Sequence, residues 1–315
     1  MPMTPDYFAN AVDPRVREWF VVGFSGEGRR ASMIPRLFNM QGSQFANEKV
    51  DGLGGIPSSG WNFEDSGRLQ EAEPIMGYEK TFNHTQFGRK LSATRTLVDD
   101  NRVAQLRDTA GMFGDAAFRV RENAGAKVFI NAFSAATSET LDDYGTDAVG
   151  PDSVALCSDA HPQSPLDSTA INNEGTLALS AANVSTTRQL HMATVDMNGE
   201  ILNVMPDEIM VPPELEDTLL TIIRSGLDPA SVNNAINPQA GRFSPIVWHY
   251  LTDATAWFMM DSGLRRQSLR WYDRVPLEIG APVVDSVGTL AVTWPVYMRF
   301  SLGWTDFRWV YGQNG

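Results

Sequence analysis

Residues whose types could perform catalysis are few in this chain. Asp159 and His161 are separated by one residue, and with a third ligand from elsewhere they could hold a metal ion. Cys157 precedes them and could in principle pair with a histidine as a nucleophile. However, a histidine before Pro162 is typical of a turn with its ring bonded to backbone, and Cys157 continues an apolar run that predicts a buried strand. We therefore expect neither a metal site nor a catalytic cysteine.

Other candidate groups have structural explanations. We interpret Asp99-Asp100 as a helix cap and Asp142-Asp143 as part of a solvated loop. The run Gly52-Leu53-Gly54-Gly55 lacks the lysine and the following helix that a phosphate-binding loop needs. The tryptophans of the second half favour core and interface positions over a cofactor site: Trp248, Trp257, Trp271, Trp294, Trp304 and Trp309. The sequence thus predicts a protein that is not an enzyme and has no cofactor.

Composition narrows the class further. The chain has 315 residues, of which 43% are hydrophobic, so a substantial core can form. Its net charge of −13 argues against direct nucleic-acid binding, which needs basic patches to displace counterions. We find no apolar run of membrane-spanning length and no signal-peptide pattern, and one cysteine excludes an internal disulfide. We expect synthesis in the cytoplasm and no contact with a membrane.

The elements that must position these residues begin with a long helix, predicted over about 99–133. Its apolar residues recur at alternating steps of three and four: Val103, Leu106, Ala110, Phe113, Ala117, Val120 and Ala124. Gly111, Gly114 and Gly125 interrupt the pattern, so we expect tight packing or another backbone close by. A helix of about 50 Å would cross a compact ball of this size, which predicts a flat, long subunit.

Two segments precede the helix. Residues 1–45 contain short helices, one starting at Asp13-Pro14, and they either pack on their own molecule or form an arm on a neighbour. Residues 51–77 are rich in glycine and poor in apolar residues. This stretch is either a disordered insertion or, as we prefer, a two-stranded ribbon that leaves the body and lies on another subunit. The chain returns through strand-like residues 78–94.

A second α+β lobe is predicted over about 175–285. We expect loop over most of 163–183 and a helix over 184–197 capped by Asn183. Further on we expect strands alternating with a helix: a buried strand broken by prolines over Glu208–Pro213, the helix over Glu214–Ser225, and strands over Ile246–Trp248, Ala256–Met260 and Leu269–Tyr272.

The C-terminal stretch predicts one long strand. Apolar side chains occupy the even positions from Leu290 to Trp304. Pro295 indicates an edge strand or a local break, because proline cannot donate to a ladder. The phase then flips, which a bulge near Asp306 would explain. Because helix and strand have similar lengths, we expect each to pack on the other.

Four segments together resemble the tailed-bacteriophage major capsid proteins of Hong Kong 97-type fold, and most closely the Mu-like major head subunit group. Their order carries the resemblance: Tyr78–Asp100 with Phe87-Gly88, Val154–Pro162 with the Ser-x-x-His-Pro run, Val211-Pro212-Pro213-Glu214-Leu215, and Arg299–Tyr311 with Gly303, Asp306 and Arg308. Cys157 stands where that group has an aromatic residue. The likeness spans most of residues 75–311.

The resemblance implies an α+β fold with an N-terminal arm, an extended β-hairpin loop, a spine helix, a peripheral lobe and an axial lobe. It implies this division: the arm over 1–45, the extended loop and flanking strands over 46–94, the peripheral lobe with the spine helix over 95–174, the axial lobe over 175–285, and the closing strand of the peripheral lobe over 286–315. No segment supports carrying over the lysine–asparagine cross-link of some members.

The implied function is self-assembly, as pentamers and hexamers, into an icosahedral shell around phage double-stranded DNA without sequence-specific binding. The implied location is the virion, with assembly in the host bacterial cytoplasm. A separate scaffolding protein, a portal and a decoration protein are the implied partners. Our candidates for intersubunit contacts are Trp19, Phe20, Trp61, Phe63, Arg68, Glu71 and Glu73. The alternative is an encapsulin-type prokaryotic shell that holds enzyme cargo.

Overall fold

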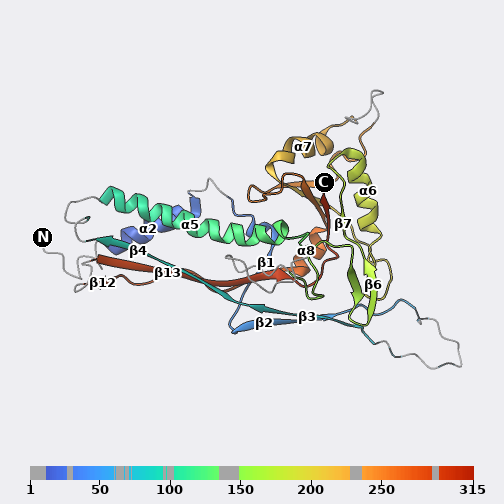
Figure 1. The fold of residues 1–315 in the computed structure, drawn as a ribbon, viewed down its shortest axis with the longest axis horizontal. Helices are drawn as coiled ribbons and strands as arrows, with labels where there is room; N and C mark the ends of the chain where they lie inside the picture. Colours follow the sequence, from blue (N-terminus) through green and yellow to red (C-terminus); the bar gives the residue numbers. More distant parts are fainter. Residues whose placement is uncertain are drawn as a thin grey trace.

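The structure is a computed structural model, and it describes residues 12–26, 31–59, 61, 67, 71, 73–94, 97, 103–134, 149–227, 236–285 and 291–315. Its helices are α2 (Asp13–Ser25), α3 (Ile34–Leu37), α5 (Val103–Ile130), α6 (Ala181–Met192), α7 (Glu216–Arg224) and α8 (Ser262–Ser268), with a 3₁₀ turn η3 (Pro213–Leu215). Figure 1 shows a long flat part, in which α5 lies along a sheet, and a second part that stands at one end of it.

Most strands form two sheets of five. The first has the order β1 (Asn39–Gly42), β11 (Leu269–Ile279), β13 (Ala291–Trp304) and β12 (Val283–Asp285), with β4 (Thr85–Thr94) also paired to β13. The second has the order β7 (Glu174–Gly175), β14 (Val310–Asn314), β10 (Ala256–Met260), β8 (Glu208–Val211) and β9 (Ser244–Val247). Two-stranded ribbons are formed by β2 (Asn47–Leu53) with β3 (Met76–Asn83), and by β5 (His161–Ser164) with β6 (Asp167–Ile171).

The long C-terminal strand β13 lies inside the first sheet and is not an edge strand. Of the two explanations for Pro295, the local break in the ladder is therefore the correct one. Strand β13 pairs with β4 on one side and with β11 and β12 on the other. On that second side, β13 pairs with β12 up to Thr293 and with β11 from Val296 onward. Pro295 lies in the gap between these two partners. Its carbonyl accepts from Gly280 N at 2.8 Å, and the missing N–H falls where the ladder changes partner.

The predicted packing of helix α5 on strand β13 is confirmed. One cluster of buried residues joins Leu106 and Ala110 of the helix to Val292 and Trp294 of the strand. A larger cluster joins the other end of the helix, around Phe129, to the strand's Met298, Phe300, Leu302 and Trp304. The helix and the strand therefore share a core along most of their length, as the matching apolar stripes predict.

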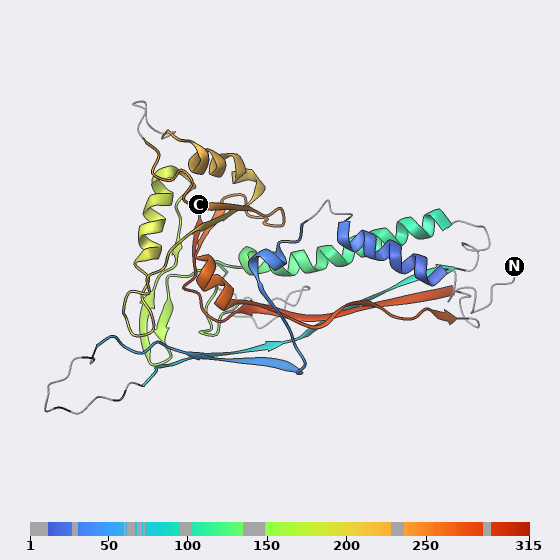
Figure 2. The same cartoon turned by 180° about the vertical axis from the view of Figure 1, so that it is seen from behind.

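Helix α2 lies beside α5 on the same side of the sheet (Figure 2). A Cβ atom at Gly114 would lie 2.2 Å from the carbonyl oxygen of Phe20, and one at Gly23 would lie 2.1 Å from that of Gly111. The expected close approach of another backbone is therefore confirmed at Gly114, where α2 supplies it. A Cβ at Gly125 would instead meet the side chains of Ile34, Trp248 and Phe38, which is the tight packing that was the other expectation, and a Cβ at Gly111 would lie in open space. The N-terminal region was expected either to pack on its own molecule or to form an arm on a neighbour. The residues of α2 pack on their own molecule.

The second sheet builds a separate core with α6 and α7. Its buried residues include Val184, Leu219, Ile222, Trp257 and Met259, all at most 4% exposed. The helix expected over 184–197 is displaced toward the N-terminus as α6, because Ser180, and not Asn183, accepts the backbone N–H of Asn183 as N-cap. The loop expected over 163–183 is wrong in part, since it contains most of the β5–β6 hairpin and β7.

The two sheets do not follow the sequence ranges of the predicted lobes. Strands β11 and β12 fall within 175–285 but pair with β13 in the first sheet. Strand β14 falls within 286–315 but pairs with β10 in the second. The flip in apolar phase after Thr305 is therefore not a bulge, because the chain leaves one sheet there and enters the other.

Candidate interaction surfaces and buried polar sites

The β2–β3 ribbon presents apolar side chains to solvent. Its strands pair from Asn47↔Asn83 to Leu53↔Met76, and in Figures 1 and 2 they run past the foot of β6. Met76 of β3 is 76% exposed. Trp61, in the segment that connects the two strands, is 75% exposed, and its indole N–H is donated to the Pro57 carbonyl at 3.2 Å. Since a large exposed side chain with an oriented ring is typical of a contact point, this ribbon can supply adhesion to another molecule.

The other candidate contact residues differ in how far the structure exposes them. Phe20 is 3% exposed and packs on Phe113 with ring centroids 5.8 Å apart, so its side chain already has a partner in its own chain. Trp19 is half-buried at the edge of the same cluster. Glu71 and Glu73 are exposed. Phe63 and Arg68 lie outside the described residues, as do the carboxylate pairs Asp99-Asp100 and Asp142-Asp143.

His161 is buried and bonded to a carboxylate that the spacing of residues did not indicate. Its Nδ1 lies 2.5 Å from Asp152 Oδ2, and its ring stacks on Phe307 at 3.7 Å. Asp159, the partner considered from the sequence, is exposed. Within the part of the chain that the structure describes, no three His, Cys, Asp or Glu side chains gather where a metal could bind. The expectation of a turn residue with its ring bonded to backbone is wrong, because His161 begins strand β5 and its ring is bonded to a carboxylate.

Cys157 is buried but does not lie in a strand, so the strand predicted there is wrong. The segment is irregular, and it is held because Cys157 N donates to the Ala132 carbonyl at 2.8 Å. Burial raises the pKa of the Cys157 thiol well above its usual value, and the nearby Glu174 carboxylate adds to the rise. A thiol that stays protonated and enclosed is a poor nucleophile.

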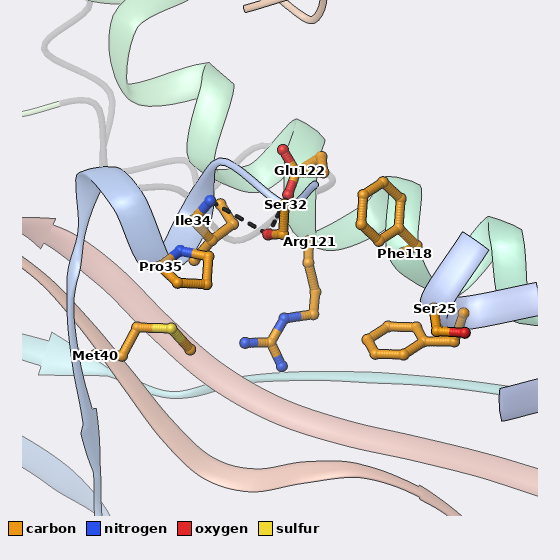
Figure 3. Close-up of a pocket in the computed structure, with 9 residues that line it drawn as sticks. Ser25, Ser32, Ile34, Pro35, Met40, Phe118, Arg121 and Glu122 are labelled. Atoms are coloured by element: carbon orange, nitrogen blue, oxygen red, sulfur yellow. Dashed lines mark hydrogen bonds between the residues drawn. The ribbon is translucent and has the colours of Figure 1, made fainter. Parts of the chain in front are cut away.

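A pocket of about 310 Å³ lies between α2, α3 and α5. Figure 3 shows the Arg121 guanidinium reaching into it and the Glu122 carboxylate beside Ser32. Glu122 is 2% exposed and accepts from Ser32 Oγ at 2.5 Å, Met33 N at 3.2 Å and Trp248 Nε1 at 3.1 Å. The carboxylate thus joins three segments far apart in sequence. Arg121 is engaged with Asp273 at 3.1 Å and lies over the Trp271 ring.

Two further histidines, His84 and His191, are buried. The His191 ring nitrogen Nε2 lies 3.1 Å from the Arg308 carbonyl, and desolvation lowers its pKa from 6.5 to about 4. His84 lies between the hydroxyls of Ser43 and Ser301, and desolvation followed by the Arg299 charge lowers its pKa. Both rings therefore stay uncharged at neutral pH, where they act as hydrogen-bonding groups of the core.

Arg308 fixes the passage between the two sheets. It is 3% exposed and donates to Asp306 Oδ1 at 3.0 Å, to the Val195 carbonyl at 2.8 Å and to the Gln163 carbonyl at 2.6 Å. The Gly303, Asp306 and Arg308 pattern indicated this residue through a resemblance alone. Nothing in the sequence indicated Glu122 or Asp152, because a lone carboxylate becomes a binding point only when distant segments surround it.

The described residues include no helix that is both long and apolar enough to cross a membrane. Of the core and interface positions that we predicted for six tryptophans, the structure shows core positions for all, at no more than 2% exposure: Trp248, Trp257, Trp271, Trp294, Trp304 and Trp309.

Comparison with known families matches residues 78–312 to a family described as "Phage capsid protein". No curated protein sequence matches the chain. The family match does not single out a Mu-like group, so that assignment stays a prediction.

Solved structures with the same fold include one described as Mycobacterium phage Bobi, at a TM-score of 0.53 and 13% identity, covering 90% of this chain and 89% of that chain. Another is described as the capsid of Myoviridae Phage XM1, with a TM-score of 0.52, 11% identity and coverage of 90% and 92%. A third is described as the capsid of an empty GTA particle, with a TM-score of 0.54, 11% identity and coverage of 90% and 89%. At such identities the likeness establishes the fold.

Proposed function

This chain belongs to the phage capsid protein family, and we propose that its copies assemble as pentamers and hexamers into an icosahedral shell around double-stranded DNA. It is a structural major capsid protein with a Hong Kong 97-type fold. The observation that carries the proposal is the family match over residues 78–312, which includes the long helix and every strand of the two five-stranded sheets except β1, with β14 cut short at residue 312. The shell surrounds the genome without binding its sequence, which suits a chain of net charge −13.

The flat shape of the subunit suits tiling. Helix α5 and strand β13 form a two-layer plank, and the second sheet stands at its end (Figure 1). We assign the plank to the peripheral lobe, the second sheet with α6 and α7 to the axial lobe that meets its copies around five- and six-fold axes, and the β2–β3 ribbon to the extended loop. The N-terminal arm comprises residues 1–45.

The segment between the two strands of the ribbon, residues 54–75, supplies the intersubunit contacts that we consider most important. Trp61 would be an apolar anchor on a neighbouring subunit, and Glu71 and Glu73 would form ion pairs there that weaken with salt. Several modest contacts per subunit act together, because once one holds, the others form within the same assembly. Phe63 and Arg68 belong to the same proposal on sequence grounds. Trp19 is a secondary candidate, since it is only half-buried.

Assembly takes place in the host bacterial cytoplasm, and the finished location is the virion. A separate scaffolding protein, a portal and a decoration protein are the partners that a shell of this family would require. These three partners are part of the proposal because the resemblance of the sequence implies them.

Negative-stain microscopy of the purified protein tests the proposal directly. Closed shells of uniform size are expected, and particles from phage-infected cells should retain DNA after nuclease treatment. Shells of this chain that carry enzyme cargo and no genome would favour the encapsulin-type alternative. A protein that stays monomeric at high concentration, with and without co-expressed neighbouring phage proteins, would contradict both.

A further inference from the structure

The ribbon is bonded to the second part of its own chain just beyond the end of its ladder. Ser58 donates its backbone N–H to Glu200 Oε1 at 2.9 Å and its hydroxyl to the same oxygen at 2.8 Å. The second carboxylate oxygen lies 3.1 Å from Ser58 N. Both donors of one ribbon residue are therefore directed at one carboxylate that is 142 positions away in sequence.

Glu200 is held in place by a tight turn over residues 196–200. Asp196 Oδ1 accepts from Asn198 N at 2.8 Å and from Glu200 N at 3.0 Å, while Asp196 N donates to the Glu200 carbonyl at 2.7 Å. A left-handed Gly199, at φ +81°, closes the turn. Arg308 binds the Val195 carbonyl at its start. These hydrogen bonds fix the backbone of the turn, and so they fix the position from which the Glu200 carboxylate accepts from Ser58.

The ribbon itself has little that fixes its direction at this point. Its register shifts by a bulge between Asp51 and Leu53, and the two strands come so close that a Cβ at Gly77 would lie 2.7 Å from the Gly52 carbonyl carbon. After the Leu53↔Met76 pair, the described residues of the two arms share one backbone bond, from Gly54 N to the Ile75 carbonyl at 2.7 Å. An outside contact must therefore orient the chain beyond it.

Contact with the same turn begins before Ser58. A Cβ at Gly54 would lie 3.2 Å from Met197 Sδ, and one at Gly55 would lie 3.2 Å from Asn198 Nδ2 and 3.3 Å from Asp196 Oδ2. Glycines allow this approach because they present no side chain. Residues 54–58 consequently lie along the turn and end on the Glu200 carboxylate.

We infer that Glu200 is a positioning residue, which sets the direction in which the ribbon leaves its own subunit before a neighbour is bound. This inference rests on the proposed function, because a preset direction matters only for a ribbon that docks on another copy. Holding the ribbon in advance removes conformational freedom that docking would otherwise have to remove.

The test compares Glu200→Ala and Glu200→Gln with the unaltered chain. Amide hydrogen exchange of residues 54–58 is measured in the unassembled subunit, and particle yield is counted by negative stain. Loss of the charged acceptor should speed exchange at Ser58 by roughly five- to tenfold in Glu200→Ala, and by less in Glu200→Gln, which keeps one acceptor oxygen. Ser58→Ala, which keeps the backbone donor, should give an intermediate particle yield.

The matched control is Glu214→Gln, which makes the same charge change at an exposed site elsewhere in the same part of the chain. It should leave both exchange at Ser58 and particle yield unchanged, and all variants should keep their thermal midpoint within about 2 °C. Unchanged exchange at Ser58 in Glu200→Ala, or faster exchange with a full yield of normal particles, would overturn the inference. An unaltered chain that builds no particles would instead contradict the proposed function, while the exchange comparison would still decide whether Glu200 holds the ribbon.

Discussion

Glu122, Arg265 and Arg308 are buried charged side chains, and each binds groups from segments far apart in the sequence. Arg265 on α8 pairs with Glu208 of β8 at 2.8 Å and donates to the carbonyls of Arg36 and Leu37. It therefore attaches the N-terminal segment to the second sheet. Because each such group satisfies several backbone atoms at once, its loss leaves partners without hydrogen bonds in a dry environment.

Substitution of Glu122 tests this at the residue scale. Glu122→Ala should lower the free energy of unfolding by about 3 kcal/mol, because Trp248 Nε1 and Met33 N lose their acceptor. Glu122→Gln should cost less, since one oxygen remains. Urea unfolding of the unassembled subunit measures both, with the exposed Glu18→Ala as control at less than about 0.5 kcal/mol. Equal stabilities of Glu122→Ala and the control would show that the carboxylate holds nothing.

His191 predicts a dependence of stability on pH. Its pKa is lowered from 6.5 to about 4 in the folded chain, so the unfolded chain binds a proton first as the pH falls. Stability is then fully present above about pH 6.5 and is lost progressively toward pH 4. Linkage gives an upper bound of about 2 kcal/mol for this loss between pH 7 and pH 5.

His191→Gln should remove this part of the acid sensitivity, because glutamine takes up no proton. Unfolding in urea at pH 7 and pH 5 gives the difference for each variant, and His249→Gln, at an exposed histidine, is the matched control. If His191→Gln retains the same loss between the two pH values as the control, another group is responsible.

At the scale of elements, the contact between α2 and α5 depends on glycine. Phe20 and Phe24 of α2 place their backbone against Gly114, while the rings of Phe24 and Phe118 meet at 6.3 Å. Such a contact lets two helices approach more closely than side chains would allow, and it draws the N-terminal segment onto the plank.

Two glycines of α5 provide a matched pair of substitutions. Gly114→Ala should destabilise the chain by about 2 kcal/mol, because its Cβ would lie 2.2 Å from the Phe20 carbonyl oxygen and α2 must shift. Gly111→Ala places its Cβ in open space and should stabilise by up to about 1 kcal/mol through helix propensity. Thermal or urea unfolding compares the two. The same sign of change in both would contradict the close contact.

At the scale of the whole molecule, residues 55–73 beyond the ribbon are separable from the cores. The ribbon itself is attached to the first sheet, because Phe82 of β3 is 2% exposed and the centroid of its ring lies 5.2 Å from that of Tyr272. The buried clusters of the two sheets contain none of residues 55–73 among the described ones. Folding of the body should therefore survive the removal of this segment, while contact with other copies should not.

Deletion of residues 55–73 should leave a folded monomer that builds no shells. Circular dichroism and unfolding should match the unaltered chain, because both sheets remain complete, and sedimentation should show monomers or small oligomers. Trp61→Ala is the milder variant and should reduce the yield of shells without changing the fold. Normal shells from the deletion variant would refute the role of the ribbon.

The sequence by itself determined the longest helix, the longest strand and the face that each of them buries. The heptad-like stripe predicted α5, found over Val103–Ile130, and the strict alternation predicted β13, found over Ala291–Trp304. Both patterns are local, since a helix or strand that buries one face must repeat its apolar residues at the period of its backbone. The mutual packing of the two followed from their similar length.

Only the tertiary structure decided which segments cover one another. It placed Pro295 inside a sheet at a change of partner, gave His161 a carboxylate nine residues away, buried Phe20 in its own chain, and joined Ser58 to Glu200. The residues in these contacts are not related by the helix or strand repeat, so no local pattern in the sequence indicates them. They arise because each polar or apolar group is satisfied by whichever distant segment the packing of the whole chain brings to it.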